Sequence, residues 1–199
     1  MREQCIRRAE VGDASSLMAL RIEAEGWLAH AGVDQWRDPA TRPTALAKWR
    51  ADIEAGRTWV VEEPDERLSG TVTLAAPDTD FWSTADDLGS ALYVAKLITA
   101  RNARGTRLGA RLLDWVSRRA TDQELSWVRL DCWRSNRALQ AYYLALGFEH
   151  VRTEAPPHRK SGWLAQRASA VLLHPEDVLA DCPEGRWGGR QSLTPEGVG

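Results

Sequence analysis

The stretch LYVAKLITARNARGTRLGARLLDWVSRRA, residues 92–120, decides the fold expected for this chain. Its first nine residues are mostly apolar or β-branched, as in a buried strand, and its last eleven repeat apolar residues at helical spacing. Between them lies a basic turn that contains two glycines. A strand that passes through such a turn into an amphipathic helix is the first part of a β-α-β unit.

The residues that follow continue this alternation. WVRLDCW, residues 127–133, predicts a second strand, and SNRALQAYYLALGF, residues 135–148, predicts a helix that Ser135 or Asn136 can cap. Periodicity and turn residues predict further elements on both sides of this block: strands at 5–9, 57–62, 68–75 and 149–153, helices at 13–28 and 44–56, and a last strand at either 162–167 or 170–173. This order calls for a mixed sheet with helices on both faces.

Length and charge limit the possible functions. A chain of 199 residues suits one domain, which we expect to span residues 1–174. Residues 175–199 are rich in Gly and Pro and lack periodicity, so we expect a disordered or loosely packed tail. The 26 basic residues nearly balance the 28 acidic ones, which removes the field that would gather nucleic acid or an anionic membrane. We therefore expect neither partner.

The cysteines give no sign of a stabilising framework. Cys5, Cys132 and Cys182 are too few and too scattered to predict disulfides, and no C-x-x-C pair indicates a metal site. The N-terminus has no apolar signal core, and no apolar run reaches the roughly 18 residues of a membrane helix. These features predict a cytoplasmic protein without a bound metal.

Ten tryptophans are unusual beside two Phe and three Tyr. Five of them lie on periodic segments and are expected in the core: Trp49, Trp59, Trp115, Trp127 and Trp133. Trp27, Trp36 and Trp82 lie near predicted helix ends or in loops and are better candidates for lining a pocket. Exposed indoles would also make a homodimer plausible.

The basic turn has the geometry of a pyrophosphate site. Consecutive backbone N–H groups at a helix N-terminus bind phosphate, and the helix dipole favours the negative charge. Gly105 and Gly109 would let the backbone approach closely, while Arg104 and Arg107 would place cations beside the phosphates. A glycine-rich turn before a helix is often only a tight connection, so the turn alone does not identify a function.

A second motif makes the pattern specific. Residues 104–109 are similar to the Q/R-x-x-G-x-G/A motif, and residues 136–148 to the N-x-x-A/L...Y-x-x-x-G-F segment, of the GCN5-related N-acetyltransferase (GNAT) superfamily. The segments DFW, ALYVAKL, RLDCW and YYLALGF further resemble actinobacterial members. Arg107 replaces the middle glycine of the first motif. The resemblance covers residues 5–173 and implies an α/β fold with a mixed, mostly antiparallel sheet of six or seven strands flanked by about four helices.

The resemblance implies an acyl-CoA-dependent transferase in which an amine attacks the thioester directly. Main-chain donors for the oxygen of the reacting carbonyl would come from the strand before the turn, and Tyr143 would donate to the departing thiolate. Tyr143 is favoured over Tyr142 because its spacing from Gly147 and Phe148 matches the family pattern. The residues implied to bind acetyl-CoA are Leu97, Ile98, Thr99, Arg104, Gly105, Thr106, Arg107, Leu108, Gly109, Ala110, Asn136 and Tyr143.

The acceptor amine must lose a proton before it attacks, and the sequence does not single out the base. Six groups are admissible: Glu23, Glu25, Asp80, Asp131, His30 and His158. The segment 76–90 is acidic, and a solvated loop is its favoured interpretation, with an acidic mouth that gathers a cationic amine as the alternative. Cys132 lies inside a predicted strand and is not expected to be a nucleophile.

We therefore expect an N-acetyltransferase that moves an acetyl group from acetyl-CoA to a primary amine of a small molecule or peptide. Two alternatives stay open. One is an acyltransferase that uses a longer acyl-CoA or an aminoacyl-tRNA, suggested by Arg107, and the other is a non-catalytic CoA-binding module. The acceptor depends on the loops at 30–43, 76–90 and 156–162, whose shapes the sequence does not fix.

Overall fold

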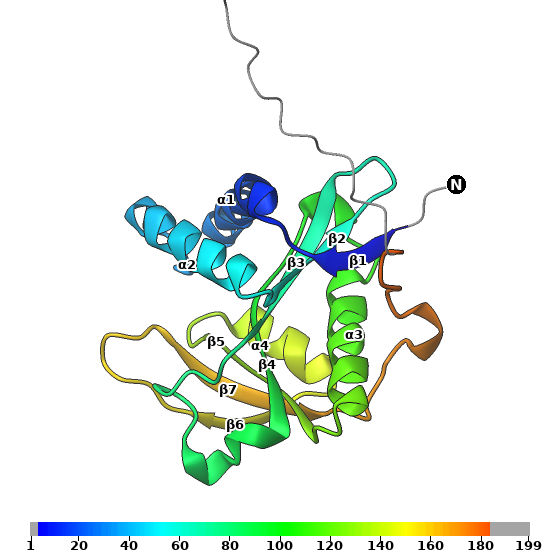
Figure 1. Ribbon diagram of the computed structural model, residues 1–199. Helices are drawn as coiled ribbons and strands as arrows, with labels where there is room; N and C mark the ends of the chain where they lie inside the picture. The colour runs from blue at the N-terminus through cyan, green and yellow to red at the C-terminus, as the bar shows by residue number, and fades with distance from the viewer. Residues whose placement is uncertain (1–3, 184–199) are drawn as a thin grey trace, which may run out of the picture.

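The computed structural model describes residues 4–183. Within these residues the chain forms one seven-stranded sheet and four α-helices (Figure 1). The strands are β1 (Cys5–Arg8), β2 (Thr58–Glu62), β3 (Leu68–Ala75), β4 (Ala91–Thr99), β5 (Trp127–Trp133), β6 (Glu149–Thr153) and β7 (Ser161–Ala168). The helices are α1 (Ala14–His30), α2 (Arg42–Glu54), α3 (Leu108–Asp122) and α4 (Arg137–Ala145). The predicted α/β fold class is confirmed.

The sheet has the strand order β1-β2-β3-β4-β5-β7-β6. Every neighbouring pair is antiparallel except β4 and β5, which are parallel and joined through α3. A parallel pair needs a crossover connection, which the turn and helix of residues 92–120 provide. Strand β4 is the central strand of the seven. Of the two positions predicted for the last strand, the first is occupied, by β7.

The helices cover opposite faces of the sheet, as Figure 1 shows for α1 and α2 on one side and α3 on the other. Strand β2 illustrates why: Trp59 and Val61 pack with the buried residues of α3, whereas Val60 packs with those of α1 and α2. Alternation along a strand sends successive side chains to opposite faces. Each fully buried aliphatic side chain in these layers contributes about 1.5–3 kcal/mol to the stability of the fold.

Close packing fixes the N-terminus of α3 over β3. A Cβ atom built on Gly70 of β3 would lie 3.2 Å from the side chains of both Leu108 and Leu112. Leu108 is the first residue of α3, and both leucines are buried. The absence of a side chain at Gly70 therefore lets the helix begin directly above the sheet.

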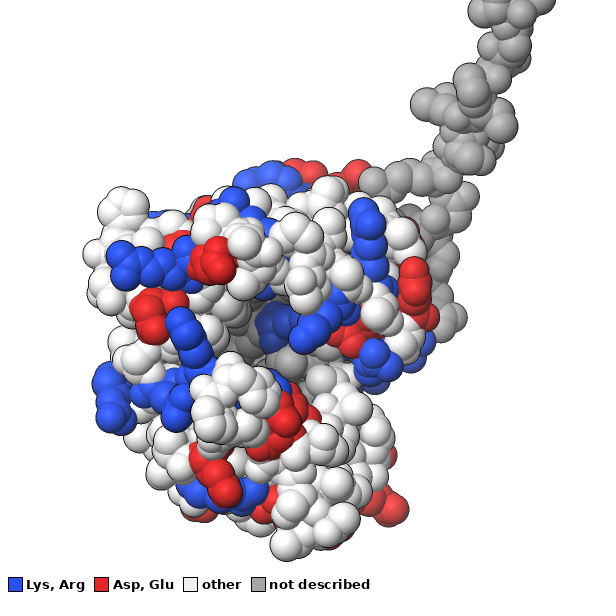
Figure 2. Space-filling view, turned by 90° about the vertical axis from the view of Figure 1, so that its left-hand side faces the viewer, with Lys and Arg blue, Asp and Glu red and all other residues white. Residues whose placement is uncertain are grey.

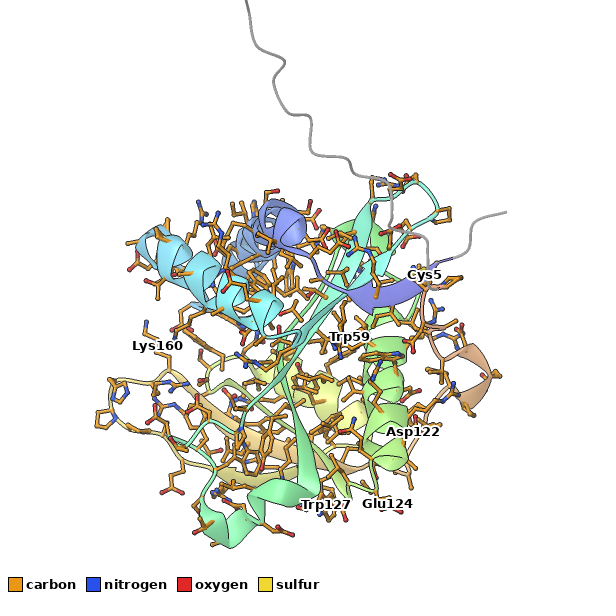
Figure 3. All side chains as sticks on the ribbon, viewed as in Figure 1. Cys5, Trp59, Asp122, Glu124, Trp127 and Lys160 are labelled. Atoms are coloured by element: carbon orange, nitrogen blue, oxygen red, sulfur yellow. A yellow bond between two sulfur atoms is a disulfide. The ribbon has the colours of Figure 1, made fainter. Side chains whose placement is uncertain are left out.

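A disulfide joins β1 to the C-terminal end of the described residues, which differs from the expectation drawn from the cysteine count. Cys5, labelled in Figure 3, lies on β1 and is bonded to Cys182, 177 residues later. Cys132 is a buried free cysteine. The pairing could not be predicted because it depends on the return of the chain to β1. Disulfides persist mainly in oxidising compartments, so the cysteine argument for a reducing cytoplasm no longer holds.

The beginning of the predicted tail is packed rather than loose. Leu179 is buried, the N–H of Ile6 donates to the carbonyl of Ala180 at 2.9 Å, and the N–H of Cys182 donates to the carbonyl of Ile6 at 2.8 Å. The indole of Trp115 on α3 donates to Asp181 at 3.0 Å. Residues 175–183 therefore form a strap along β1 and α3, and the rest of the predicted tail, 184–199, lies outside the described residues. Among the helices of the described part, none is long and apolar enough to cross a membrane.

Candidate active site

The site is built where the two parallel strands separate. Residues Ala91 to Val94 of β4 lie opposite Trp127 to Leu130 of β5, and there the pairing of these two strands ends. From Asp131 onward β5 pairs only with β7. The far end of β4 pairs only with β3. The sheet therefore opens between the ends of β4 and β5.

A β-bulge in β4 widens this opening. Thr71 and Thr73 of β3 face Ile98 and Ala95 of β4, so two β4 residues, 96 and 97, lie opposite the single residue between those threonines. Lys96 takes the left-handed backbone conformation, with φ of 51°. The extra residue also reverses the alternation of side chains: Val94 packs toward α3, whereas Ile98 packs toward α1.

One side of the opening holds a cavity of about 300 Å³. Six of the residues predicted to bind the donor line it: Leu97, Ile98, Thr99, Gly109, Asn136 and Tyr143. They come from β4, from the first turn of α3, and from α4 with its cap. The structure thus brings together residues that lie up to 46 positions apart, between 97 and 143 of the sequence.

The other predicted donor residues form the turn that leads into α3. Arg104, Gly105, Thr106 and Arg107 are exposed, whereas the side chains of Leu108 and Ala110 are buried in the core. Within the described chain no side chain caps the N-terminus of α3. The first N–H groups of a helix have no partner inside the helix, so those of residues 108–110 are available to an acceptor. Their direction and the helix dipole favour an anion.

Arg107 occupies a backbone conformation that favours glycine. Its φ is 58° and its ψ is 18°, in the left-handed region, which explains why the family motif carries glycine at this position. Its guanidinium lies 3.6 Å from the carboxylate of Asp177 on the strap, and Arg111 pairs with the same carboxylate at 3.1 Å. The side chain therefore points away from the cavity, and the turn keeps its shape despite the substitution.

Asn136 acts as the N-cap of α4. Its Oδ1 accepts from the N–H of Leu139 at 3.0 Å, and its Nδ2 donates to Gln35 at 2.8 Å. This is the capping role predicted from the sequence. Gln35 lines the same cavity, so the cap also fastens the loop at 30–43 to α4.

Both tyrosines of α4 line the small cavity, in different environments. Tyr143 is buried, and burial raises the pKa of its phenol far above the usual value. Among the described residues, no hydrogen bond contributes to this shift. Tyr142 is 38% exposed, and its hydroxyl packs against Gly109, where an added Cβ would lie only 2.4 Å from it. A phenol with a raised pKa stays protonated at neutral pH and can donate.

The other side of the opening holds a larger cavity, of about 1090 Å³, between α2, the loop at 30–43 and the strand ends. Gln35, Trp36 and Ile98 line both cavities. The two cavities therefore meet at the gap between β4 and β5. Figure 2 shows the hollow on this face of the molecule.

Of the six candidate bases, Asp131 and His158 line the larger cavity. Asp131 lies on β5 where the strands separate, and burial raises the pKa of its carboxyl although a hydrogen bond with Ser161 partly opposes the shift. His158 is exposed, with its Nε2 3.6 Å from Asp80. The position and environment of Asp131 suit a base better.

The other candidate bases are engaged in structural contacts. Glu25 is buried between Arg21 at 2.8 Å and Arg42 at 2.7 Å. Glu23 accepts from the main-chain N–H of Arg101, His30 contacts the carbonyl of Gly26, and Asp80 pairs with Arg159. Cys132 is buried, and burial raises the pKa of its thiol to about 12, as suits a buried strand residue rather than a nucleophile.

The acidic loop does not form an acidic mouth. Asp78 pairs with Arg159 at 2.7 Å, and Asp86 pairs with Arg152 at 2.7 Å. The Arg152 guanidinium is the main reason that the pKa of Asp86 falls to about 2. These arginines lie on or beside β6 and β7, so the loop is neutralised by segments that the sequence could not place next to it.

The tryptophans divide differently from the prediction. Trp27 and Trp36 line cavities as expected, whereas Trp82 is buried against Tyr93. Trp49 is buried in the core as predicted, although it also lines the larger cavity. Trp133, also predicted in the core, is only half-buried and lines the same cavity. Trp133 stands at the end of β5 beside the opening, and this strand-end position is the signal that could have found it.

Comparison with known proteins decides the family. Residues 21–148 match the model of the acetyltransferase (GNAT) family, which is more than half of the chain. The chain belongs to the GNAT acetyltransferase family. It is 28% identical over 146 residues to YesJ of Bacillus subtilis (strain 168), an uncharacterized N-acetyltransferase, covering 72% of this chain and 80% of that protein.

Several solved structures of other acetyltransferases share the fold of this GNAT family member. A GNAT acetyltransferase from Listeria monocytogenes superposes with a TM-score of 0.66 at 23% identity, over 83% of this chain and 94% of that one. The paia N-acetyltransferase of Thermoplasma acidophilum, solved with coenzyme A, gives 0.65 at 14% identity over 84% and 99%. The yncA protein of Salmonella typhimurium, solved with its cofactor acetyl-CoA, gives 0.58 at 17% identity over 85% and 96%. The expected likeness to actinobacterial members is not confirmed by these proteins.

Among residues 4–183, no group of three or more His, Cys, Asp or Glu side chains could hold a metal ion.

Proposed function

We propose that this acetyltransferase moves the acetyl group of acetyl-CoA to a primary amine of a small molecule or peptide. One observation supports this most strongly: two cavities meet at the opening between β4 and β5. The turn before α3, which is suited to bind phosphate, leads to the smaller cavity, and Asp131 lines the larger one. Donor and acceptor would occupy separate cavities and meet at the strand ends.

The donor side fits a CoA thioester. The N–H groups of residues 108–110 would hold the pyrophosphate, and Gly105, with φ of 87°, allows the turn that presents them. The main chain of residues 96 and 97 lies outside the pairing registers of both neighbouring strands, so it can donate to the oxygen of the reacting carbonyl. Two structural neighbours contain CoA or acetyl-CoA, which supports this donor.

Two side chains would transfer the protons of the reaction. Bound acetyl-CoA supplies the acetyl group as a thioester, and the transfer breaks its C–S bond and forms an N–C bond. An acceptor ammonium loses two protons: Asp131 would pass the first to solvent, and the second would end on the CoA thiol through Tyr143. The raised pKa of Asp131 brings this carboxyl nearer to the pH at which a base works, and the raised pKa of Tyr143 keeps its phenol protonated.

The structure gives no support to the other donors that Arg107 suggested. The guanidinium of Arg107 is directed to Asp177, outside the donor cavity, so it does not reshape the space for the acyl chain. The cytoplasmic location and a homodimer stay predictions.

Turnover with a panel of primary amines, followed by release of free CoA thiol, tests the proposal. We expect Tyr143→Phe to lower kcat by about 10²-fold or more and to change the Kd for CoA by no more than about three-fold. Tyr142→Phe on the same helix is the matched control and should keep most of the turnover. Equal turnover by wild type and Tyr143→Phe would remove this residue from the mechanism. CoA binding without turnover of any amine would favour the non-catalytic module.

A further inference from the structure

The larger cavity carries an excess of basic side chains. Six of its lining residues are cationic: Arg21, Arg37, Lys48, Lys96, Arg159 and Lys160. Three lining residues are acidic: Asp34, Asp38 and Asp131. Figure 2 shows Lys and Arg side chains in and around the hollow, and Figure 3 shows Lys160 on the same side of the molecule as α2.

Three of these cations are already neutralised. Arg21 pairs with Glu25 at 2.8 Å, Lys96 pairs with Asp52, and Arg159 pairs with the acidic loop. Lys160 lies 4.0 Å from Asp34, at the limit of an ion pair. Arg37 and Lys48, by contrast, form no ion pair and no side-chain hydrogen bond with the described residues. The wall formed by α2 and the loop before it therefore presents two cations that pair with no described carboxylate.

Three indoles of the cavity already have a cation near the ring. Arg21 lies over Trp36 at 5.0 Å, Lys96 over Trp49 at 6.0 Å, and Lys160 over Trp133 at 5.9 Å, each measured to the ring centroid. A cation held over an aromatic face uses the attraction that a ligand ammonium would otherwise gain. A second positive charge of the acceptor beside these rings would be repelled by the cation already there.

The lining carboxylates leave one position for an ammonium. Asp34 accepts from the indole of Trp133 at 2.8 Å and from Ser135 at 2.5 Å, and these hydrogen bonds lower the pKa of its carboxyl. Asp38 accepts from the main-chain N–H of Ala40 at 2.9 Å. Asp131, at the opening, forms no ion pair with the described residues. An acceptor with one amine at the opening and one anionic group at the α2 wall would match these lining charges.

We infer that the acceptor is an amine that also bears a carboxylate, as an amino acid does, and that Arg37 and Lys48 recognise that carboxylate. This inference rests on the proposed function and specifies its acceptor. A polyamine would place further positive charge against Arg37 and Lys48, and the carboxylates of Asp34 and Asp38 already accept hydrogen bonds from other groups. The two cations would act mainly on the KM of the acceptor, because they lie on the wall rather than at the reacting atoms.

Matched substrate pairs test the inference. Each pair is an amino acid and the amine formed by its decarboxylation, such as lysine and cadaverine, histidine and histamine, or tyrosine and tyramine. We expect kcat/KM to be about ten-fold or more higher for the amino acid of a preferred pair, since tenfold corresponds to about 1.4 kcal/mol, within reach of two charge-assisted contacts. The preference should shrink in high salt, because exposed charges are screened.

Variants locate the preference. In the double variant Arg37→Ala Lys48→Ala, the ratio between the pair members should fall to within about two-fold, while kcat for the decarboxylated amine stays near that of the wild type. Arg50→Ala is the control, because Arg50 is exposed on the same helix but does not line the cavity. A double variant that keeps the full ratio would overturn the inference, as would a wild type that prefers the decarboxylated amines. If neither member of any pair is a substrate, a panel of simple monoamines is tested next. Turnover of a monoamine would overturn only the inference about the carboxylate. Turnover of no monoamine would overturn the proposed function itself.

Discussion

The contact between Gly109 and Tyr142 offers a sharp test of the donor cavity. In Gly109→Ala the new Cβ would lie 2.4 Å from the hydroxyl of Tyr142, and ordinary contact begins at 3.4 Å, so the two atoms must separate by about 3.4 − 2.4 = 1.0 Å. The hydroxyl is the far end of a partly exposed side chain, so the tyrosine will move rather than the backbone.

The cost to folding should be small. Displacing the ring from its rotamer costs about 0.5–1.5 kcal/mol, and alanine in place of glycine inside a helix returns about 0.5–1 kcal/mol. We therefore expect the free energy of unfolding to change by no more than about 1 kcal/mol, which is about 2–4 °C in Tm for a chain of this size. Both residues line the 300 Å³ cavity that we propose holds the donor, and a displacement of about 1 Å at a catalytic site can lower its activity up to about 10²-fold.

Calorimetric titration with CoA provides the measurement. We expect Gly109→Ala to raise the Kd for CoA about ten-fold. Adding Tyr142→Phe removes the hydroxyl, and the nearest ring atom then lies 3.5 Å from the new Cβ, which is ordinary contact, so the double variant should bind nearly as tightly as Tyr142→Phe alone. The reasoning is refuted if Gly109→Ala binds CoA like the wild type, or if the double variant binds as weakly as Gly109→Ala.

Three further predictions concern the base, a buried ion pair and the disulfide. Burial raises the pKa of Asp131, and a base acts only when it is deprotonated. On acidification kcat/KM should therefore fall with a midpoint above the ordinary aspartate pKa of about 3.9. The Asp131→Asn variant should lose this acidic limb of the pH profile together with most of the turnover. Asp114 and Arg167 are fully buried and lie 3.1 Å apart, so Asp114→Ala would leave the charge of Arg167 unpaired. We expect the free energy of unfolding, measured by denaturant titration, to fall by about 3–5 kcal/mol. A change below about 1 kcal/mol would contradict the buried ion pair. Cys182→Ser should lower the unfolding free energy by about 2–4 kcal/mol, and thiol alkylation of unfolded, unreduced wild type should label Cys132 alone; labelling of all three cysteines would show that the bond is absent.

Local patterns in the sequence predicted the elements of the fold well. In residues 92–120 the strand, the turn and the helix all appear where expected. Their signals are the spacing of apolar residues, the turn residues and the helix-forming residues, each of which acts on neighbours only a few positions away. The Asn136 cap was predictable for the same reason, since its partner Leu139 is three residues away. The order of elements then left few topologies for the sheet.

Features that depend on distant contacts were not predictable. The disulfide needs the strap to return to β1, and the neutral acidic loop needs Arg152 and Arg159 from segments about 66 to 81 residues later. The bulge at Lys96 has no sequence signal, because lysine rarely adopts a positive φ, yet it reverses the side-chain alternation of β4 and opens the site. The sequence left six candidates for the base, and our proposal of Asp131 depends on its place at the opening, which only the fold shows.

A crystal structure with bound CoA tests the central claim most directly. The account predicts that the pyrophosphate contacts the N–H groups of residues 108–110, with the sulfur in the small cavity beside Tyr143 and the larger cavity still open to solvent. A CoA molecule in the larger cavity, or one that leaves the turn before α3 empty, would contradict it.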